Sequence, residues 1–126
     1  MTQSIFERYG GFSAVSRVVS DFYRRVIDSP LVSDYFHGVD MRNLIDHQTK
    51  FIATLMGGPA SYTNEHLARV HAHLGITDQA FNEITILMRE TLEDFDFDQT
   101  DISSVHAEMM SRRPFIVFEP STAATT

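Results

Sequence analysis

The sequence predicts an all-α fold. Apolar residues recur at intervals of three and four in several stretches, which is the spacing of one face of a helix. Ser, Thr or Asp stands before most of these stretches and Gly or Pro follows them, which is typical of helix N-caps and helix ends. The sequence has no alternation of apolar and polar residues long enough to build a sheet, and it has no internal repeat.

The N-terminal part predicts two helices. Ser4 and Glu7 have the spacing of a capping box, and Gly10-Gly11 end the short helix that Ser4 begins. A second helix over residues 12–27 follows, with its apolar positions on one face. Asp28-Ser29-Pro30 ends this second helix.

A brief turn and a third helix follow. We predict that Ser29-Pro30 supplies the N-cap and first residue of a turn over residues 31–36. Asp40 caps a helix over residues 41–56, and Gly57-Gly58-Pro59 terminates it. One face of this helix carries Leu44, Gln48, Phe51 and Leu55, with His47 beside them.

Two further helices are predicted after the glycine-rich break. Thr63 begins a short helix that contains His71, and Gly75 ends it. Thr77-Asp78 caps a longer helix. Its inward face consists of Phe81, Ile84, Met88 and Leu92. An acidic connection over residues 94–98 then leads to the C-terminal part.

The C-terminal part completes a single domain. A last helix over residues 99–112 ends before Pro114. The pattern of residues 115–118 fits either a frayed helix or a tail docked on the domain, and residues 119–126 are expected to be disordered. A chain of 126 residues accommodates one domain over residues 1–118 and leaves no room for a second catalytic domain.

Charge and composition exclude several classes of protein. Ten Lys and Arg against seventeen Asp and Glu give a net charge of −7, which argues against a nucleic-acid partner. The absence of Cys excludes disulfides, thiolate metal ligands and a cysteine nucleophile. No apolar run approaches the ~18 residues of a membrane span, and no signal-peptide pattern follows Met1. We therefore expect a cytoplasmic protein.

His71 is the first candidate for chemistry. It lies between Leu67 and Leu74, so its helix presents an imidazole among aliphatic side chains, a pattern that a simple core histidine also gives. His66 and His73 lie about 140° and 200° away around the helix, so neither could share an ion with His71. This excludes a zinc site of two histidines on this helix. A single axial imidazole is what a haem iron requires, because the porphyrin supplies the equatorial ligands.

Aromatic residues could clamp such a flat porphyrin. Phe22 and Phe36 would wedge it between apolar surfaces, although they could equally be ordinary core aromatics. Tyr23 adjoins Phe22, and a buried hydroxyl without a partner costs ~1–3 kcal/mol. Directing this hydroxyl toward a bound ligand, with Gln48 as its partner, removes the cost. The alternative is a hydroxyl that reaches the surface.

The ordered set of motifs resembles the group I truncated globins, a family of short haem proteins with a two-over-two helical fold. The resemblance covers about residues 4–112. It rests on Gly10-Gly11, Phe22-Tyr23, Tyr35-Phe36 with Gly38, Gly57-Gly58-Pro59 with Tyr62-Thr63, and Val70-His71 with Leu74-Gly75-Ile76-Thr77.

The resemblance implies roles for these residues around a non-covalent haem b. His71 would be the proximal iron ligand, Phe36 the haem clamp, and Tyr23 the distal hydroxyl that acts with Gln48. The remaining contacts with the haem, or with the access route of its ligand, would come from Phe22, Leu44, His47, Phe51, Leu55, Val70, Ile76, Phe81, Ile84 and Met88. From charge and proximity to His71, the candidates for holding the propionates are Tyr62, Arg69 and His73.

Two positions bear on the state of the haem. His47 stands where some relatives carry a histidine that binds the iron as a sixth ligand and others a non-ligating residue, so both states stay open. A few relatives attach a histidine near the C-terminus covalently to the haem. This chain has Arg112-Arg113-Pro114 there, and its nearest histidine, His106, lies about two turns earlier. We therefore predict non-covalent haem.

These observations predict a haem protein that binds O2, CO and NO. Tyr23 and Gln48 would slow O2 release, which suits O2 storage, dioxygenation of NO or peroxidase-like protection, with an external reductase as electron donor. The alternative is a six-coordinate sensor or redox module that uses His47 as sixth ligand. A haem-free interpretation is a helical interaction domain with His71 in its core. We expect a monomer or a weak dimer.

Overall fold

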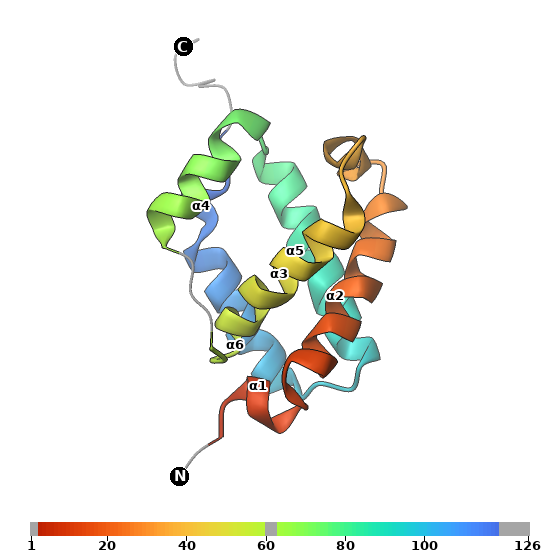
Figure 1. Ribbon diagram of the computed structural model, residues 1–126, viewed down its shortest axis with the longest axis vertical. Helices are drawn as coiled ribbons and strands as arrows, with labels where there is room; N and C mark the ends of the chain where they lie inside the picture. The colour runs from red at the N-terminus through yellow and green to blue at the C-terminus, as the bar shows by residue number, and fades with distance from the viewer. Residues whose placement is uncertain (1–2, 60–62, 119–126) are drawn as a thin grey trace.

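The computed structural model describes residues 3–59 and 63–118, and these residues form helices and no strand (Figure 1). The α-helices are α1 (Ile5–Arg8), α2 (Gly11–Ile27), α3 (Met41–Leu55), α4 (Asn64–His71), α5 (Asp78–Asp94) and α6 (Gln99–Ser111). Three short 3₁₀ helices accompany them: η1 (Ser33–Phe36), η2 (Ala72–Leu74) and η3 (Arg113–Phe115). The all-α prediction is confirmed.

Four helices begin at the polar residues that the sequence indicates. The side chains of Ser4, Asp40, Thr63 and Thr77 each accept a hydrogen bond from the backbone N–H three residues later. Such a bond satisfies a backbone donor that has no partner inside the helix. Local sequence therefore determines where α1, α3, α4 and α5 start.

The turn after α2 begins at Pro30, as predicted, and η1 follows it from Ser33 with Val32 as its N-cap. The Ser29 side chain does not supply the predicted cap. The Ser29 hydroxyl instead donates to the Glu83 carboxylate on α5 at 2.7 Å. The Ser29 carbonyl accepts from the N–H groups of Val32 and Ser33. The Ser29 side chain therefore makes a tertiary contact with α5 instead of the helix cap that the local sequence predicts.

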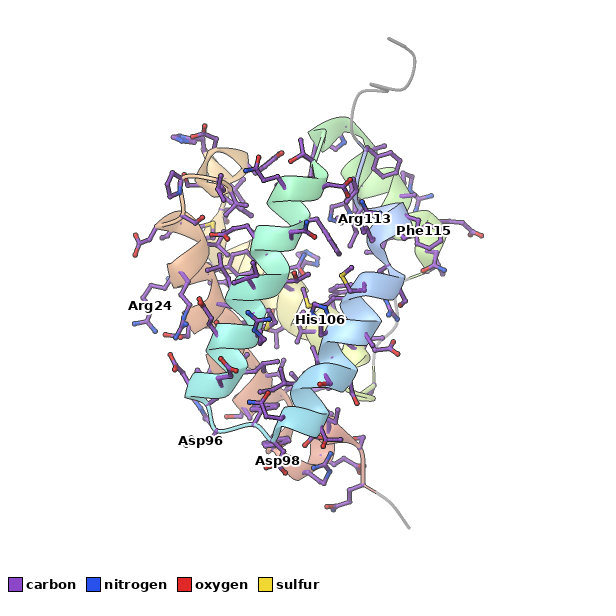
Figure 2. The ribbon with its side chains drawn as sticks, turned by 180° about the vertical axis from the view of Figure 1, so that it is seen from behind. Arg24, Asp96, Asp98, His106, Arg113 and Phe115 are labelled. Carbon is purple, nitrogen blue, oxygen red and sulfur yellow. The ribbon has the colours of Figure 1, made fainter. Side chains whose placement is uncertain are left out.

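The core lies where α2 packs against α3 and α5, and where α5 packs against α6. Figure 2 shows α5 and α6 side by side, joined by the connection that contains Asp96 and Asp98. The largest fully buried side chains are Val18, Val19, Val26, Val32, Met56, Met88, Thr91, Leu92 and Val105. None of the described helices is long and apolar enough to cross a membrane.

The N-terminal turn is fastened to α6 by a buried carboxylate. Asp101 is 7% exposed and accepts from both Arg8 guanidinium nitrogens, at 2.9 and 2.7 Å, and from the Tyr9 hydroxyl at 2.7 Å. The Tyr9 ring also stacks on Phe97, with ring centroids 3.8 Å apart. We call Arg8, Tyr9, Phe97 and Asp101 the N-terminal clasp.

We expect Asp101→Asn to destabilise the fold in a pH-dependent way. The Arg8 guanidinium and the Tyr9 hydroxyl hold the pKa of the Asp101 carboxyl below its ordinary value. The carboxylate therefore contributes fully above about pH 4 and loses its contribution as the pH falls through the folded-state pKa. The thermal midpoint should fall by roughly 5 °C at neutral pH, and the two proteins should converge in acid. Thermal unfolding followed by circular dichroism checks this, and a pH-independent difference would contradict it.

Candidate functional site

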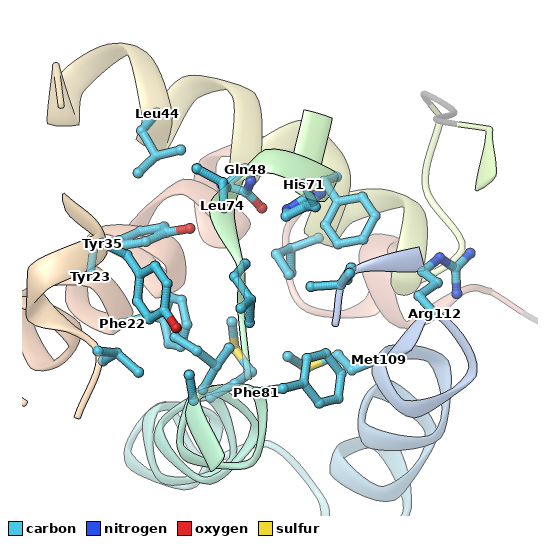
Figure 3. Close-up of a pocket in the computed structure, with 18 of the residues that line it drawn as sticks. Phe22, Tyr23, Tyr35, Leu44, Gln48, His71, Leu74, Phe81, Met109 and Arg112 are labelled. Atoms are coloured by element: carbon cyan, nitrogen blue, oxygen red, sulfur yellow. The ribbon is translucent and has the colours of Figure 1, made fainter. Parts of the chain in front are cut away.

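An apolar cavity of about 190 Å³ lies among α2, η1, α3, α4, α5 and α6 (Figure 3). We call it the central cavity. Figure 3 shows Tyr23 and Tyr35 on one side of it, His71 and Gln48 on a second, and Phe81 on a third. Every described α-helix except α1 contributes to its wall, so the cavity is a product of the whole fold.

Most of the predicted site residues meet at the central cavity. The predicted residues that line it are Phe22, Tyr23, Phe36, Leu44, Gln48, Phe51, His71, Ile76, Phe81, Ile84 and Met88. They come from six separate segments between α2 and α5. The sequence motifs that are far apart in the chain therefore converge on one space.

The structure places other predicted residues outside the central cavity. Leu55 is buried in the core, because it is four residues beyond Phe51 and near the end of α3. His47, Arg69, Val70 and His73 have exposed side chains. Tyr62 lies outside the described residues. The roles suggested for these six residues stay predictions.

The sequence reasoning missed nine residues of the cavity wall. They are Val32, Tyr35, Ile52, Leu67, Leu74, Ala80, Met109, Arg112 and Ile116. Ile52 and Leu67 each follow the helical spacing of a named residue, Gln48 and His71, four positions away, and this signal could have found them. Met109, Arg112 and Ile116 reach the cavity from the C-terminal part, where no local motif indicated it.

His71 has a defined hydrogen-bonded state. Its Nδ1 lies 2.8 Å from the backbone carbonyl oxygen of Leu67. A carbonyl oxygen only accepts hydrogen bonds, so Nδ1 carries the proton and Nε2 keeps its lone pair. Burial lowers the pKa of His71 below its ordinary value, which keeps the imidazole neutral. The arrangement suits a metal ligand that uses Nε2.

No second protein ligand is positioned to share a metal with His71. Across residues 3–59 and 63–118, no group of three or more His, Asp or Glu side chains could hold an ion. A metal at His71 would therefore find no cluster of further ligands among the described residues and would need ligands from another source. A macrocycle that brings its own four nitrogens meets that requirement.

Tyr23 is a hydrogen-bond donor held against the central cavity. Its side chain is 7% exposed, and its ring makes edge contacts with Phe22 and Phe36 at centroid distances of 4.9 and 5.7 Å. Burial raises the pKa of its hydroxyl well above the ordinary value, so the group stays protonated. No other described residue forms a hydrogen bond with this hydroxyl or with the Gln48 amide. Both groups are available to a ligand in the cavity.

Arg112 is the one charged side chain that the described part of the chain brings to the cavity wall. Its guanidinium lies 6.0 Å from the centre of the Phe51 ring. It also forms an ion pair with Glu108 at 2.9 Å. The rest of the wall is uncharged and mostly apolar, as a buried hydrophobic cofactor requires.

The fold and the site together define a helical protein with a half-buried imidazole at the wall of an apolar cavity. The chain belongs to the bacterial-like globin family, whose model matches residues 4–116. A group 1 truncated hemoglobin of Mycolicibacterium paratuberculosis is 40% identical over 78 residues, which are 62% of this chain and 57% of that protein. Another, from Tetrahymena pyriformis, is 29% identical over 73% of this chain and 76% of its own.

Solved structures of the same class share the fold. The truncated hemoglobin of Tetrahymena pyriformis, in its Fe(III) form, superposes with a TM-score of 0.84 and 25% identity over 93% of this chain and all of that one. The 2/2 hemoglobin of a Synechococcus species, with covalently attached heme, gives a TM-score of 0.84 and 26% identity over 91% of this chain and 98% of that one. The predicted membership of the group I truncated globins and the two-over-two fold are confirmed.

The residues around the central cavity fit a haem. The ring-shaped cofactor needs one axial nitrogen, which His71 offers with its tautomer fixed by Leu67. It needs apolar surfaces, which Phe22, Phe36 and Phe81 provide. The Tyr23 hydroxyl and the Gln48 amide line the same cavity and are the polar groups that a ligand on the iron would meet.

Proposed function

We propose that this chain is a haem protein that binds O2, CO and NO, with His71 as the proximal ligand of a non-covalent haem b. The observation that carries the proposal is the neutral His71 imidazole, oriented by the Leu67 carbonyl at the wall of an apolar cavity. Family membership supports the cofactor. The Arg112-Arg113-Pro114 stretch offers no histidine for covalent attachment.

The chemistry of the site follows from the groups around the cavity. Haem, when bound, supplies an iron that takes up diatomic gases. The Tyr23 hydroxyl and the Gln48 amide would donate hydrogen bonds to a gas molecule in the cavity, which would favour an acceptor with partial negative charge such as O2. Phe22 and Phe36 exclude water from the same space. Tight retention of O2 suits reaction with NO more than reversible transport.

We propose NO dioxygenation as the activity of this site. The reaction joins NO and O2 and consumes one electron to give nitrate, so each turnover requires an electron donor. We propose that an external reductase supplies this electron. Storage of O2 is the alternative use of the same site.

A six-coordinate sensor or redox module is the second candidate. It requires His47 to reach the iron from α3, one position before the cavity-lining Gln48. In the structure the His47 side chain is exposed and does not line the central cavity. The observed position of His47 therefore supports an open sixth site.

The visible absorption spectrum of the haem-loaded protein in its ferrous, ligand-free state tests the proposal. We expect a broad spectrum typical of five-coordinate, high-spin iron, because His47 lies outside the cavity. Sharp, split low-spin bands would identify an internal sixth ligand and favour the sensor. His47→Leu distinguishes the cases further, since it should leave a five-coordinate spectrum unchanged and should abolish low-spin bands that come from His47.

A further inference from the structure

The helix that carries His71 has little anchorage of its own. Among the residues of α4, Leu67 alone is buried, and the helix is only eight residues long. Isolated helices of this length are unstable in water, so neighbouring elements must hold it. The main neighbours of α4 are η2, which directly follows it, and η3, near the C-terminal end of the described chain. The position of His71 therefore depends on contacts made outside α4.

Three contacts converge on the segment directly after η2, residues 75–78. The Tyr35 hydroxyl donates to the Gly75 carbonyl at 3.3 Å, and the Phe118 N–H donates to the Ile76 carbonyl at 3.0 Å. Arg113 forms an ion pair with Asp78, at the first residue of α5. We call residues 75–78 the latch segment.

The latch segment is bound from two sides. Tyr35 belongs to η1, which precedes α3, while Arg113 and Phe118 belong to the C-terminal part. Gly75 has a φ of 64°, a left-handed conformation that ends η2 and presents its carbonyl to Tyr35. Tyr35 and Ile76 also line the central cavity. The Tyr35 bond thus joins η1 to the segment after η2 at the wall of the central cavity.

We propose that Tyr35 is a positioning residue for His71. Its hydrogen bond to the Gly75 carbonyl holds the latch segment in place, so loss of this bond loosens α4 and speeds release of the cofactor. This inference rests on the proposed function, because it takes His71 as the iron ligand. Tyr35 has no part in stabilising the gaseous ligand, a role that Tyr23 and Gln48 fill. Arg113 supports the same segment from the opposite side.

The test compares Tyr35→Phe with Tyr9→Phe. Both remove one tyrosine hydroxyl that is hydrogen-bonded in the structure, but Tyr9 bonds Asp101 in the N-terminal clasp and does not line the cavity. Haem transfer to an excess of a high-affinity haem-scavenging apoprotein gives the rate of release. The resonance Raman iron–histidine stretch of the ferrous protein reports directly on the His71 bond.

We expect Tyr35→Phe to speed haem release about three- to tenfold, the range that loss of one hydrogen bond predicts, and to lower the iron–histidine stretching frequency. Tyr9→Phe should change neither. Arg113→Gln should speed release in the same direction and stands in if Tyr35→Phe does not fold. Equal effects of the Tyr35 and Tyr9 variants, or no effect of Tyr35→Phe and of Arg113→Gln, would overturn this inference and leave the proposed function standing. Failure of the wild-type protein to take up haem would overturn the proposed function as well.

Discussion

Replacing His71 by alanine should abolish stable haem binding. No other histidine lines the central cavity within the described chain, so the variant leaves the iron without a protein ligand. Loss of a group that merely orients a metal ligand costs about 10–100-fold in affinity, and loss of the ligand itself should cost more. Titration of the apoprotein with hemin, followed at the Soret band, measures the affinity.

His106→Ala is the matched control for this substitution. His106 is exposed on α6 and does not line the central cavity, so the same change of residue type there should leave hemin binding close to wild type. Circular dichroism of both apoproteins should show that the helices persist. Unchanged haem affinity in His71→Ala would contradict the assignment of the proximal ligand and would favour a core role for this histidine.

Replacing Tyr23 by phenylalanine should speed O2 dissociation by about 10–100-fold. A hydrogen bond to a charged acceptor contributes about 1.5–3 kcal/mol, and each 1.4 kcal/mol corresponds to a factor of ten in rate. The phenylalanine ring retains the edge contacts with Phe22 and Phe36, so the change removes little besides the hydroxyl. Stopped-flow displacement of O2 by CO measures the dissociation rate.

Gln48→Leu is a second test of the same ligand contact, and Tyr9→Phe is the control. Gln48→Leu should also speed O2 dissociation, and the double variant should show less than the sum of the two effects in free energy, because the two groups act on one ligand. Tyr9→Phe removes a hydroxyl that bonds Asp101 and does not line the cavity, so it should leave the rate unchanged. A wild-type dissociation rate in Tyr23→Phe would mean that its hydroxyl does not face the ligand.

Local sequence predicts most of the helices because caps and periodicity are local properties. Thr63 is predicted to begin the helix that carries His71, and Thr77 the long helix that follows. The structure confirms both N-caps. The central-cavity residues Phe22 and Gln48 could also be predicted, since helical spacing puts them on inward faces, whereas the role of Tyr23 is implied by the family resemblance.

The parts that could not be predicted depend on contacts between distant segments. Ser29 is a residue type that often caps a helix, yet its hydroxyl donates to the carboxylate of Glu83, 54 residues later. Met109 and Ile116 reach the cavity because the C-terminal part folds back over α4, and nothing in their neighbours indicates this. His47 directly precedes Gln48, so helical geometry puts the two side chains about 100° apart around α3. This difference leaves His47 exposed while Gln48 lines the cavity.

The N-terminal clasp has a consequence for how the molecule opens. It ties α1 to α6 through a buried carboxylate, whereas α4 buries a single side chain and relies on its neighbours. Local unfolding should therefore be cheapest at α4 and most costly around Val18, Val105 and Asp101. Amide hydrogen exchange should be fast along Asn64–His71 and slow along the core of α2 and α6. A globin with this gradient can admit and release its cofactor through a small excursion at one end while the remainder of the chain keeps its native structure.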